Sequence, residues 1–259
     1  MKNYYEYSEK DIIKSFSILK LKKNDNLIVT TSLGMLGFIN SKNNINEVFL
    51  RIIQDHIGLN GTLFVPTYSY SFGQKKIFNV RKTKSCIGDF GNFILKQKNI
   101  YRSEDPMTSI IGLGPKAEKI LSIDKNTSYG RGCTFEKMLN IDLKIINIGL
   151  GPNWIPFIHY LDYLNKVPYR HDKIFKGQIV DRNNIKKKIT WHYPVRNADV
   201  ESRANGHLLG KLAEKQKIFI STRLGRGRIL FAKYSKLFKF SKKITSKNKY
   251  LTSYYVKNY

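Results

Sequence analysis

The sequence predicts an α/β fold built as one large unit, and two observations support this fold class. A strand pattern at 27–30, a helical pattern after Asn44 and a strand pattern at 62–65 follow one another. This alternation is typical of parallel strands joined by a helix. The length of 259 residues and the hydrophobic content of 41% also suit one large α/β unit with a substantial core.

The first elements have clear start and stop signals. Ser8 with Asp11 three residues later resembles a capping box, and the apolar positions from 12 to 19 then fall on one helix face. The strand at 27–30, Leu-Ile-Val-Thr, has the character of a buried strand. Asn44 caps the second helix, which Gly58 ends. Pro66 stops the strand at 62–65, so the first third of the chain reads as helix, strand, helix, strand.

The rest of the chain continues the α/β pattern. Residues 67–87 are polar and aromatic, and we expect a long binding loop there. Glycines follow the strand at 144–148, which is where α/β sheets place their ligands. The remaining expected elements are a helix at 90–97, an extended segment at 107–113, a helix from Pro115 to 121, a helix at 134–139, a helix carrying His159, a hairpin of 175–180 and 186–193, a helix at 198–214, and strands at 218–220 and 228–232.

The C-terminal segment differs in composition from the rest. From residue 233 to 259 it has eight lysines, seven aromatic residues and no acidic residue. We therefore divide the chain into a domain at 1–235 and a basic aromatic tail at 236–259, and we expect the tail to add nothing to the core or the chemistry. Lysines beside aromatic rings could contact an anionic membrane peripherally.

Composition limits the class of protein. The net charge of +27 attracts anions and repels polycations. The sequence is also rich in Lys, Asn and Ile, and an AT-rich genome would produce this excess without selection for a partner. Cys86 and Cys133 stand alone, which favours two reduced thiols and neither a metal site nor a disulfide. No apolar run reaches the ~18 residues of a membrane span, and the start lacks the apolar core of a secretory signal. We expect a cytoplasmic protein.

One pair of residues suggests acid–base chemistry. His159 and Asp162 are three residues apart in a helical pattern, so they share a helix face. A carboxylate there can fix the tautomer of the imidazole and raise its basicity. A single histidine in a helix is more often structural, so the pair alone leaves both interpretations open.

Several short motifs occur in one order along the chain. They are Thr31-Ser32-Leu33 with Leu36-Gly37, Pro66-Thr67-Tyr68, Arg102-Ser103 with Asp105-Pro106 and Ser109, Tyr129-Gly130 with Thr134 to Lys137, Gly149-Leu150-Gly151, His159 with Asp162, and Val167-Pro168-Tyr169-Arg170. In this order and spacing the chain resembles the aminoglycoside 3-N-acetyltransferase family over roughly residues 8–235. The resemblance implies a single α/β domain with a mixed central sheet flanked by helices, and acetyl-CoA as the acetyl donor.

The resemblance also implies roles for individual residues. His159 corresponds to the base that takes a proton from the substrate amine, with Asp162 beside it, and Thr67 to the position next to the reacting acetyl group. The cofactor groove corresponds to Thr31, Ser32, Leu33, Gly37, Arg102, Ser103 and Ser109. Arginine is chemically suited to the phosphates of coenzyme A.

The chain departs from the family pattern near the acceptor. Thr30 and Asp105 stand where the family usually has histidines, and Asp162 replaces a glutamate. Together with the net charge of +27, these changes favour an amino-sugar nucleotide or another surface-glycan precursor as the acetylated amine. The alternative is an aminoglycoside, with antibiotic resistance as the outcome. A second alternative is a non-catalytic protein that binds anionic surfaces or nucleic acid on this scaffold, although we expect no specific nucleic-acid partner.

Overall fold

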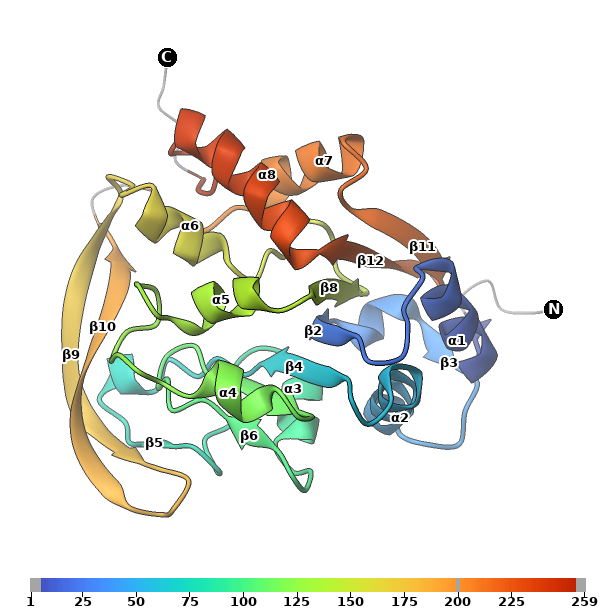
Figure 1. Cartoon of the computed structure of the whole chain (residues 1–259), viewed down its shortest axis with the longest axis horizontal. Coiled ribbons are helices and arrows are strands. Elements are labelled where there is room, and N and C mark those ends of the chain that lie inside the picture. The colour runs from blue at the N-terminus through green and yellow to red at the C-terminus, as the bar shows by residue number, and fades with distance from the viewer. Residues whose placement is uncertain (1–5, 199–200, 255–259) are drawn as a thin grey trace.

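A seven-stranded mixed sheet runs through the centre of the molecule (Figure 1). The computed structural model describes residues 6–198 and 201–254. In space the strands follow the order β11-β12-β8-β2-β4-β7-β6. Their bounds are Ile220–Leu224 for β11, Gly227–Lys233 for β12, Leu143–Ile148 for β8, Asn26–Thr31 for β2, Thr62–Pro66 for β4, Ile110–Leu113 for β7 and Tyr101–Arg102 for β6.

Three parallel strands form the middle of this sheet. β2 pairs in parallel with β4 on one side and with β8 on the other, as the strand–helix–strand pattern predicts. The outer strands β12 and β7 pair antiparallel with β8 and β4. The expected mixed central sheet is therefore confirmed, and the carboxyl ends of β2, β4 and β8 meet at one edge.

Helices cover both faces of the sheet, and the alternation of side chains along β2 shows how. Leu27 and Val29 point into a core shared with α1 (Glu9–Ile18), α2 (Ile45–Ile57) and α3 (Asp89–Ile94). Ile28 points to the opposite core, shared with α4 (Ala117–Leu121), α5 (Thr134–Lys137), α6 (Ile158–Leu164), α7 (His207–Lys215) and α8 (Tyr234–Lys247). Since side chains alternate along a strand, the run of three apolar residues at 27–29 indicates a sheet that is buried on both faces.

A long β-ribbon wraps one side of the molecule (Figure 1). β9 (Arg170–Val180) and β10 (Lys186–Arg196) pair antiparallel over their full length, so the predicted hairpin is confirmed and is longer than expected. Asp181 holds the turn by accepting hydrogen bonds from the amides of Asn183 and Ile185. The predicted long loop contributes a third strand, β5 (Phe78–Asn79), parallel to β9. Short elements complete the chain: β1 (Glu6–Tyr7), β3 (Phe38–Ile39), η1 (Leu33–Leu36), η2 (Phe72–Gln74) and η3 (Met138–Asn140).

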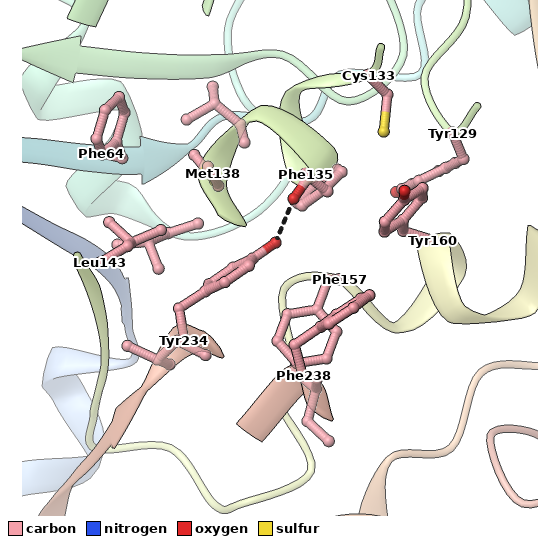
Figure 2. Packing of buried hydrophobic residues seen from close by; sticks show 14 of the residues in the cluster. Phe64, Tyr129, Cys133, Phe135, Met138, Leu143, Phe157, Tyr160, Tyr234 and Phe238 are labelled. Atoms are coloured by element: carbon pink, nitrogen blue, oxygen red, sulfur yellow. Dashed lines mark hydrogen bonds between the residues drawn. The ribbon is translucent and has the colours of Figure 1, made fainter. Parts of the chain in front are cut away.

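The expectation for the C-terminal segment is wrong. The segment continues as α8, whose residues Tyr234, Leu237 and Phe238 are buried in the core. Figure 2 shows Tyr234 and Phe238 among the packed side chains of this core. The hydroxyl of Tyr234 donates a hydrogen bond of 2.9 Å to the carbonyl of Phe135 in α5. Apolar residues on one face and lysines on the other are typical of an amphipathic helix, so the lysine content concealed a packing element. Residues 255–259 lie outside the described part.

Smaller differences concern element bounds. The expected helix at 198–214 begins only at His207, because residues 201–206 are irregular and positions 199–200 lie outside the described residues. The extended segment expected from Met107 begins at Ile110, because Asp105 holds Met107 and Thr108 in a turn. Among the described residues, no helix is long and apolar enough to cross a membrane.

Candidate active site

His159 and Asp162 form a hydrogen-bonded pair on α6. The Nδ1 atom of His159 lies 3.0 Å from the Oδ2 atom of Asp162, as the spacing of three residues on a helix predicts. The Asp162 side chain is 1% exposed and that of His159 is 16% exposed. The pair orients the imidazole and leaves its other nitrogen, Nε2, available to a substrate.

Three further side chains converge on Asp162. The Nε atom of Arg170 donates to Oδ2 at 2.9 Å. The hydroxyls of Tyr169 and Thr252 donate to Oδ1 at 3.1 Å and 2.6 Å. Thr252 follows α8 in the chain, so the C-terminal segment, expected to be a dispensable tail, supports the carboxylate behind the histidine.

The environment sets the charge state of the pair. Burial lowers the pKa of His159 and outweighs the hydrogen bond to Asp162, which raises it. Burial acts to raise the pKa of Asp162, but the hydrogen bond to His159 and the charges of His159 and Arg170 outweigh it, so the net shift is downward. A neutral imidazole beside an ionised carboxylate is the state that a general base requires at neutral pH.

His159 lies at the junction of two cavities. One measures about 870 Å³, and its wall includes Arg170, Arg196 and Arg203. The other measures about 290 Å³ and is lined mainly by aromatic and apolar side chains. They include Tyr68 and Tyr70 of the long loop, Tyr129 of the α4–α5 connection, Trp154 and Ile155 of the β8–α6 connection, and Ile158 of α6. The Tyr129 ring meets the imidazole edge-on at 5.5 Å between centroids. A reacting group at the base therefore has room on two sides.

A third cavity continues the groove along the carboxyl ends of the central strands. It measures about 320 Å³, contains Thr31 and Ser32, and shares Thr30 and Trp154 with the aromatic cavity. Thr30 donates a hydrogen bond of 2.6 Å from its hydroxyl to the amide oxygen of Asn147 on β8. Two of the residues expected in the cofactor groove, Thr31 and Ser32, are thus on the path to His159.

A fourth cavity lies at the far end of this path. It measures about 580 Å³ and is lined by Arg223, Arg226 and Arg228 of the β11–β12 hairpin, by Met35, and by the glycine turn after β8. It shares Leu150 with the Thr31–Ser32 cavity. A groove therefore runs from the arginine hairpin past the strand ends to the base.

Comparison with known proteins identifies the family. The sequence model described as aminoglycoside 3-N-acetyltransferase matches residues 28–246. The chain belongs to this family. The expected enzyme class, an acetyl-CoA-dependent N-acetyltransferase, is confirmed with it. The family match extends past residue 235 into α8, in agreement with the packing of that helix. No curated protein sequence matches the chain closely enough to count as a relative.

Solved structures of aminoglycoside acetyltransferases share the fold of this family member. AAC(3)-Xa is 14% identical, with a TM-score of 0.77 over 93% of each chain. AAC-VIa bound to sisomicin is 13% identical, with a TM-score of 0.80 over 93% of this chain and 98% of that one. AAC-IIIb in a binary complex with CoASH is 14% identical, with a TM-score of 0.77 over 93% and 97%. At such low identities these likenesses show the fold.

Other residues expected at the site of the acetyltransferase lie away from it. Thr67, fully buried, donates its hydroxyl to the carbonyl of Ser109 at 3.1 Å, and neither residue lines the groove. The Ser109 hydroxyl returns a bond of 2.8 Å to the Thr67 carbonyl. The Ser103 hydroxyl accepts from the amide of Ile110 at 3.0 Å. These side chains join β4, β6 and β7, so the roles expected beside the acetyl group and in the cofactor groove are not supported.

Arg102 is also structural. Its guanidinium donates to the Ser109 hydroxyl and to the carbonyls of Thr67, Val80 and Thr83 at 2.7–3.2 Å. The residue is 2% exposed, and burial lowers its pKa to about 10. With its donors used on protein oxygens, Arg102 anchors the long loop and does not face the groove. These contacts do not support the expectation that Arg102 binds the phosphates of the cofactor.

Leu33 and Gly37, also expected in the cofactor groove, occupy structural positions. Leu33 is buried in the core on the α1–α3 side, and Gly37 ends η1 with a φ of 97°, a left-handed conformation that favours glycine. Asp105, at a position where the family usually has histidine, accepts bonds from the amides of Met107 and Thr108 and from the Ser128 hydroxyl. Among the described residues no group of His, Cys, Asp and Glu could hold a metal ion.

Sequence reasoning missed two sets of arginines. Arg196 sits opposite Arg170 in the β9–β10 register, which only the pairing of the ribbon reveals. The other set consists of Arg223, Arg226 and Arg228. The sequence does contain a signal for it, because these three arginines alternate with Gly225 and Gly227 in a predicted turn between two strands.

Proposed function

We propose that this acetyltransferase moves an acetyl group from acetyl-CoA to a primary amine of an amino sugar, with His159 as the general base. The observation that carries the proposal is the position of the His159–Asp162 pair, at the junction of a groove that ends among the strand tips and a second, larger cavity. We place the enzyme in the cytoplasm, where acetyl-CoA is available.

The chemistry follows from the charge state of the base. A protonated sugar amine has no lone pair, so neutral His159 first takes its proton at Nε2. The amine nitrogen then attacks the thioester carbonyl, the carbon–sulfur bond breaks, and the imidazolium gives its proton to the leaving sulfur. The nitrogen loses its second proton to water through the regenerated imidazole, which leaves the neutral amide and the free thiol. Asp162 stabilises the positive charge that His159 carries between these steps. The donor and the acceptor react directly, and no covalent enzyme intermediate is needed.

The comparisons favour an aminoglycoside as the acceptor to test first. Sisomicin is bound to the similar AAC-VIa, and a gentamicin is bound to a variant of AAC(3)-IVa that is 15% identical with a TM-score of 0.76. The expected surface-glycan precursor has no such support among these structures. The family match and these structures therefore favour the alternative considered in the sequence analysis.

A specific observation keeps an anionic amino sugar as the second candidate. The large cavity beside His159 has three arginines in its wall, and Glu201 is the one carboxylate among the described residues that line it. Glu201 is already paired with Arg203 at 3.0 Å. Arg170 and Arg196 face each other across the ribbon. Asp162 pairs with Arg170 and Glu201 with Arg203, so among the described residues Arg196 is the arginine of this wall that has no carboxylate partner. Such a wall suits a phosphate or carboxylate better than a polycation.

Release of the free thiol of CoA tests the proposal. We expect acetyl-CoA turnover to depend on an added acceptor, and compare three: a gentamicin-type aminoglycoside, glucosamine and glucosamine 6-phosphate. The last two carry the same amine and differ by one phosphate. A preference for the aminoglycoside supports the first candidate, and a preference for the phosphorylated sugar that is lost in Arg196→Ala supports the second.

A non-catalytic role predicts a different result. A ligand at ~100 times its dissociation constant stabilises a protein by about 2.7 kcal/mol, which a thermal shift detects. We expect this shift with acetyl-CoA. Its absence, together with the absence of turnover with every acceptor, would contradict the proposed enzyme and favour a binding protein on this scaffold.

A further inference from the structure

The segment that follows α8, residues 249–254, lies against the active site, and we call it the C-terminal strap. α8 ends beside α6 (Figure 1), where the side-chain amide of Asn165 donates to the hydroxyl of Thr245 at 2.8 Å. The family model matches residues 28–246, so the strap lies beyond the matched residues. Any role of the strap in the reaction therefore belongs to this chain and has to be read from its own contacts.

The side chain of Thr252 in the strap faces the base. Thr252 is 2% exposed, and its hydroxyl donates to the Oδ1 atom of Asp162 at 2.6 Å, while the Oδ2 atom lies 3.0 Å from Nδ1 of His159. The hydroxyl of Tyr169 is farther from Oδ1, at 3.1 Å, and its one proton is shared with the carbonyl of Lys249 at 3.1 Å. Because a carboxylate is planar, the bond from Thr252 to one oxygen also fixes the direction in which the other oxygen meets His159.

The backbone of the strap holds a wall of the two cavities that meet at His159. The carbonyl of Thr252 accepts from the amide of Asn205 at 2.8 Å, and the amide of Tyr254 donates to the carbonyl of Arg203 at 3.0 Å. Ala204, between these two bonds, lines both the large cavity and the aromatic cavity. Since residues 201–206 form no helix or strand, these bonds to the strap define where the wall stands.

Tyr254 brings an aromatic ring to the same wall. Its side chain lines the aromatic cavity and is 50% exposed. The guanidinium of Arg203, which lines the large cavity, lies 5.5 Å from the centre of the ring. A half-exposed ring beside the base offers an apolar face to a ligand, next to the polar groups of the larger cavity, and this combination is typical of binding sites for small molecules.

We infer that the C-terminal strap is part of the acceptor site, in which Thr252 is a positioning residue that aligns Asp162 with His159 and Tyr254 contacts the acceptor. This inference rests on the proposed function and concerns the acceptor side alone. Among the described residues that line the Thr31–Ser32 cavity and the arginine hairpin cavity, none belongs to 249–254 or to 203–206. We therefore expect acetyl-CoA to bind independently of the strap.

Steady-state kinetics test the inference, with whichever acceptor wild type uses best among the gentamicin-type aminoglycoside, glucosamine and glucosamine 6-phosphate. Thr252→Val keeps the shape of the side chain and removes the hydroxyl, and we expect kcat to fall by about 10- to 100-fold because the base is displaced. Thr252→Ser keeps the hydroxyl and should restore kcat to within about threefold of wild type. Tyr254→Ala should raise the acceptor KM by about 3- to 10-fold and leave kcat within about twofold.

The matched control is Ser246→Ala. This variant also loses one hydroxyl near the end of α8, but Ser246 is exposed and its described bond goes to the carbonyl of Lys243 in the same helix. We expect wild-type kcat and KM. Calorimetry with acetyl-CoA then shows that each variant is folded, with an affinity within about twofold of wild type.

The outcomes separate the strap from the proposed function. A kcat for Thr252→Val within about twofold of wild type would overturn the inference, and so would equal falls in Thr252→Val and Thr252→Ser, because packing rather than the hydroxyl would then matter. An unchanged acceptor KM in Tyr254→Ala, or a loss of acetyl-CoA affinity in the strap variants, would overturn it as well. In each of these cases transfer by wild type still supports the proposed function, whereas a wild-type protein that releases no thiol with any of the three acceptors contradicts that function itself.

Discussion

Replacing Asp162 with asparagine removes one negative charge and keeps the shape of the side chain. The carboxylate accepts four hydrogen bonds, from His159, Arg170, Tyr169 and Thr252. The amide oxygen of asparagine can still accept from His159 and Arg170, and its NH₂ group can donate to the two hydroxyls. The substitution therefore tests the charge of Asp162 more than its position.

The magnitude follows from the bond to His159. When the imidazole takes a proton, its bond to Asp162 joins two charged groups, worth ~1.5–3 kcal/mol, against ~0.5–1.5 kcal/mol for a bond to a neutral partner. The difference of about 1–1.5 kcal/mol corresponds to a fall in kcat of about 5- to 13-fold. Arg170, 7% exposed, loses its buried partner, and breaking such a pair costs up to about 3–5 kcal/mol of stability.

The assay is steady-state release of free thiol from acetyl-CoA at saturating acceptor, run well below the melting temperature of the variant. Glu136→Gln is the control. Glu136 of α5 accepts a hydrogen bond from Tyr160, which is on the same helix as His159, but no contact between Glu136 and His159 is described. We expect the control to keep kcat within about twofold. A kcat for Asp162→Asn that is also within twofold of wild type would refute the idea that the carboxylate stabilises the protonated base.

Three further predictions follow from the same contacts. In an NMR titration, the pKa of the His159 ring should lie below its usual value of 6.5, because burial disfavours the charged form. His159 is therefore neutral and able to act as a base above its pKa, and activity falls as the pH drops through that value. A midpoint above 6.5 would contradict this. Arg102→Met should lower the free energy of unfolding by about 2 kcal/mol or more, since it leaves the carbonyls of Val80 and Thr83 without this donor, while the Thr67 carbonyl keeps the Ser109 hydroxyl. Coenzyme A affinity of the folded protein should stay the same in calorimetry; a weaker affinity at unchanged stability would return Arg102 to the cofactor site. A chain ending at residue 233 should fail to unfold cooperatively in calorimetry, because it loses Tyr234, Leu237 and Phe238 from the core. Burial of each of these side chains contributes ~1.5–3 kcal/mol to the free energy of unfolding. A stable, active truncated protein would show that α8 is dispensable.

The parts of the site that the sequence predicts are local ones. The His159–Asp162 pair follows from helical periodicity, and the positions of Thr31 and Ser32 at a strand end follow from the α/β pattern. The groups that complete the site come from distant segments. Thr252 reaches Asp162 across 90 residues, and no periodic pattern connects two such positions.

Arg102 and Ser109 show the limits of motif matching. Arg102 and Ser109 occur in a family motif, yet their side chains bond to one another and to the backbone of Thr67. A motif indicates that certain residue types are required at certain positions. It does not show whether their side chains contact a ligand or form hydrogen bonds that stabilise the fold. The helix α8 was missed for a related reason, because its lysines dominate the composition while a narrow apolar face decides its packing.

The role of His159 as general base is the central claim, and the variant His159→Gln tests it most directly. Glutamine keeps a polar side chain of similar reach but cannot take a proton at neutral pH. We predict that acetyl transfer falls by about 10²- to 10⁴-fold while the calorimetric affinity for acetyl-CoA stays within twofold of wild type. Wild-type turnover in this variant at neutral pH would contradict the account, because the proton of the amine would then have to leave by a route that does not involve His159.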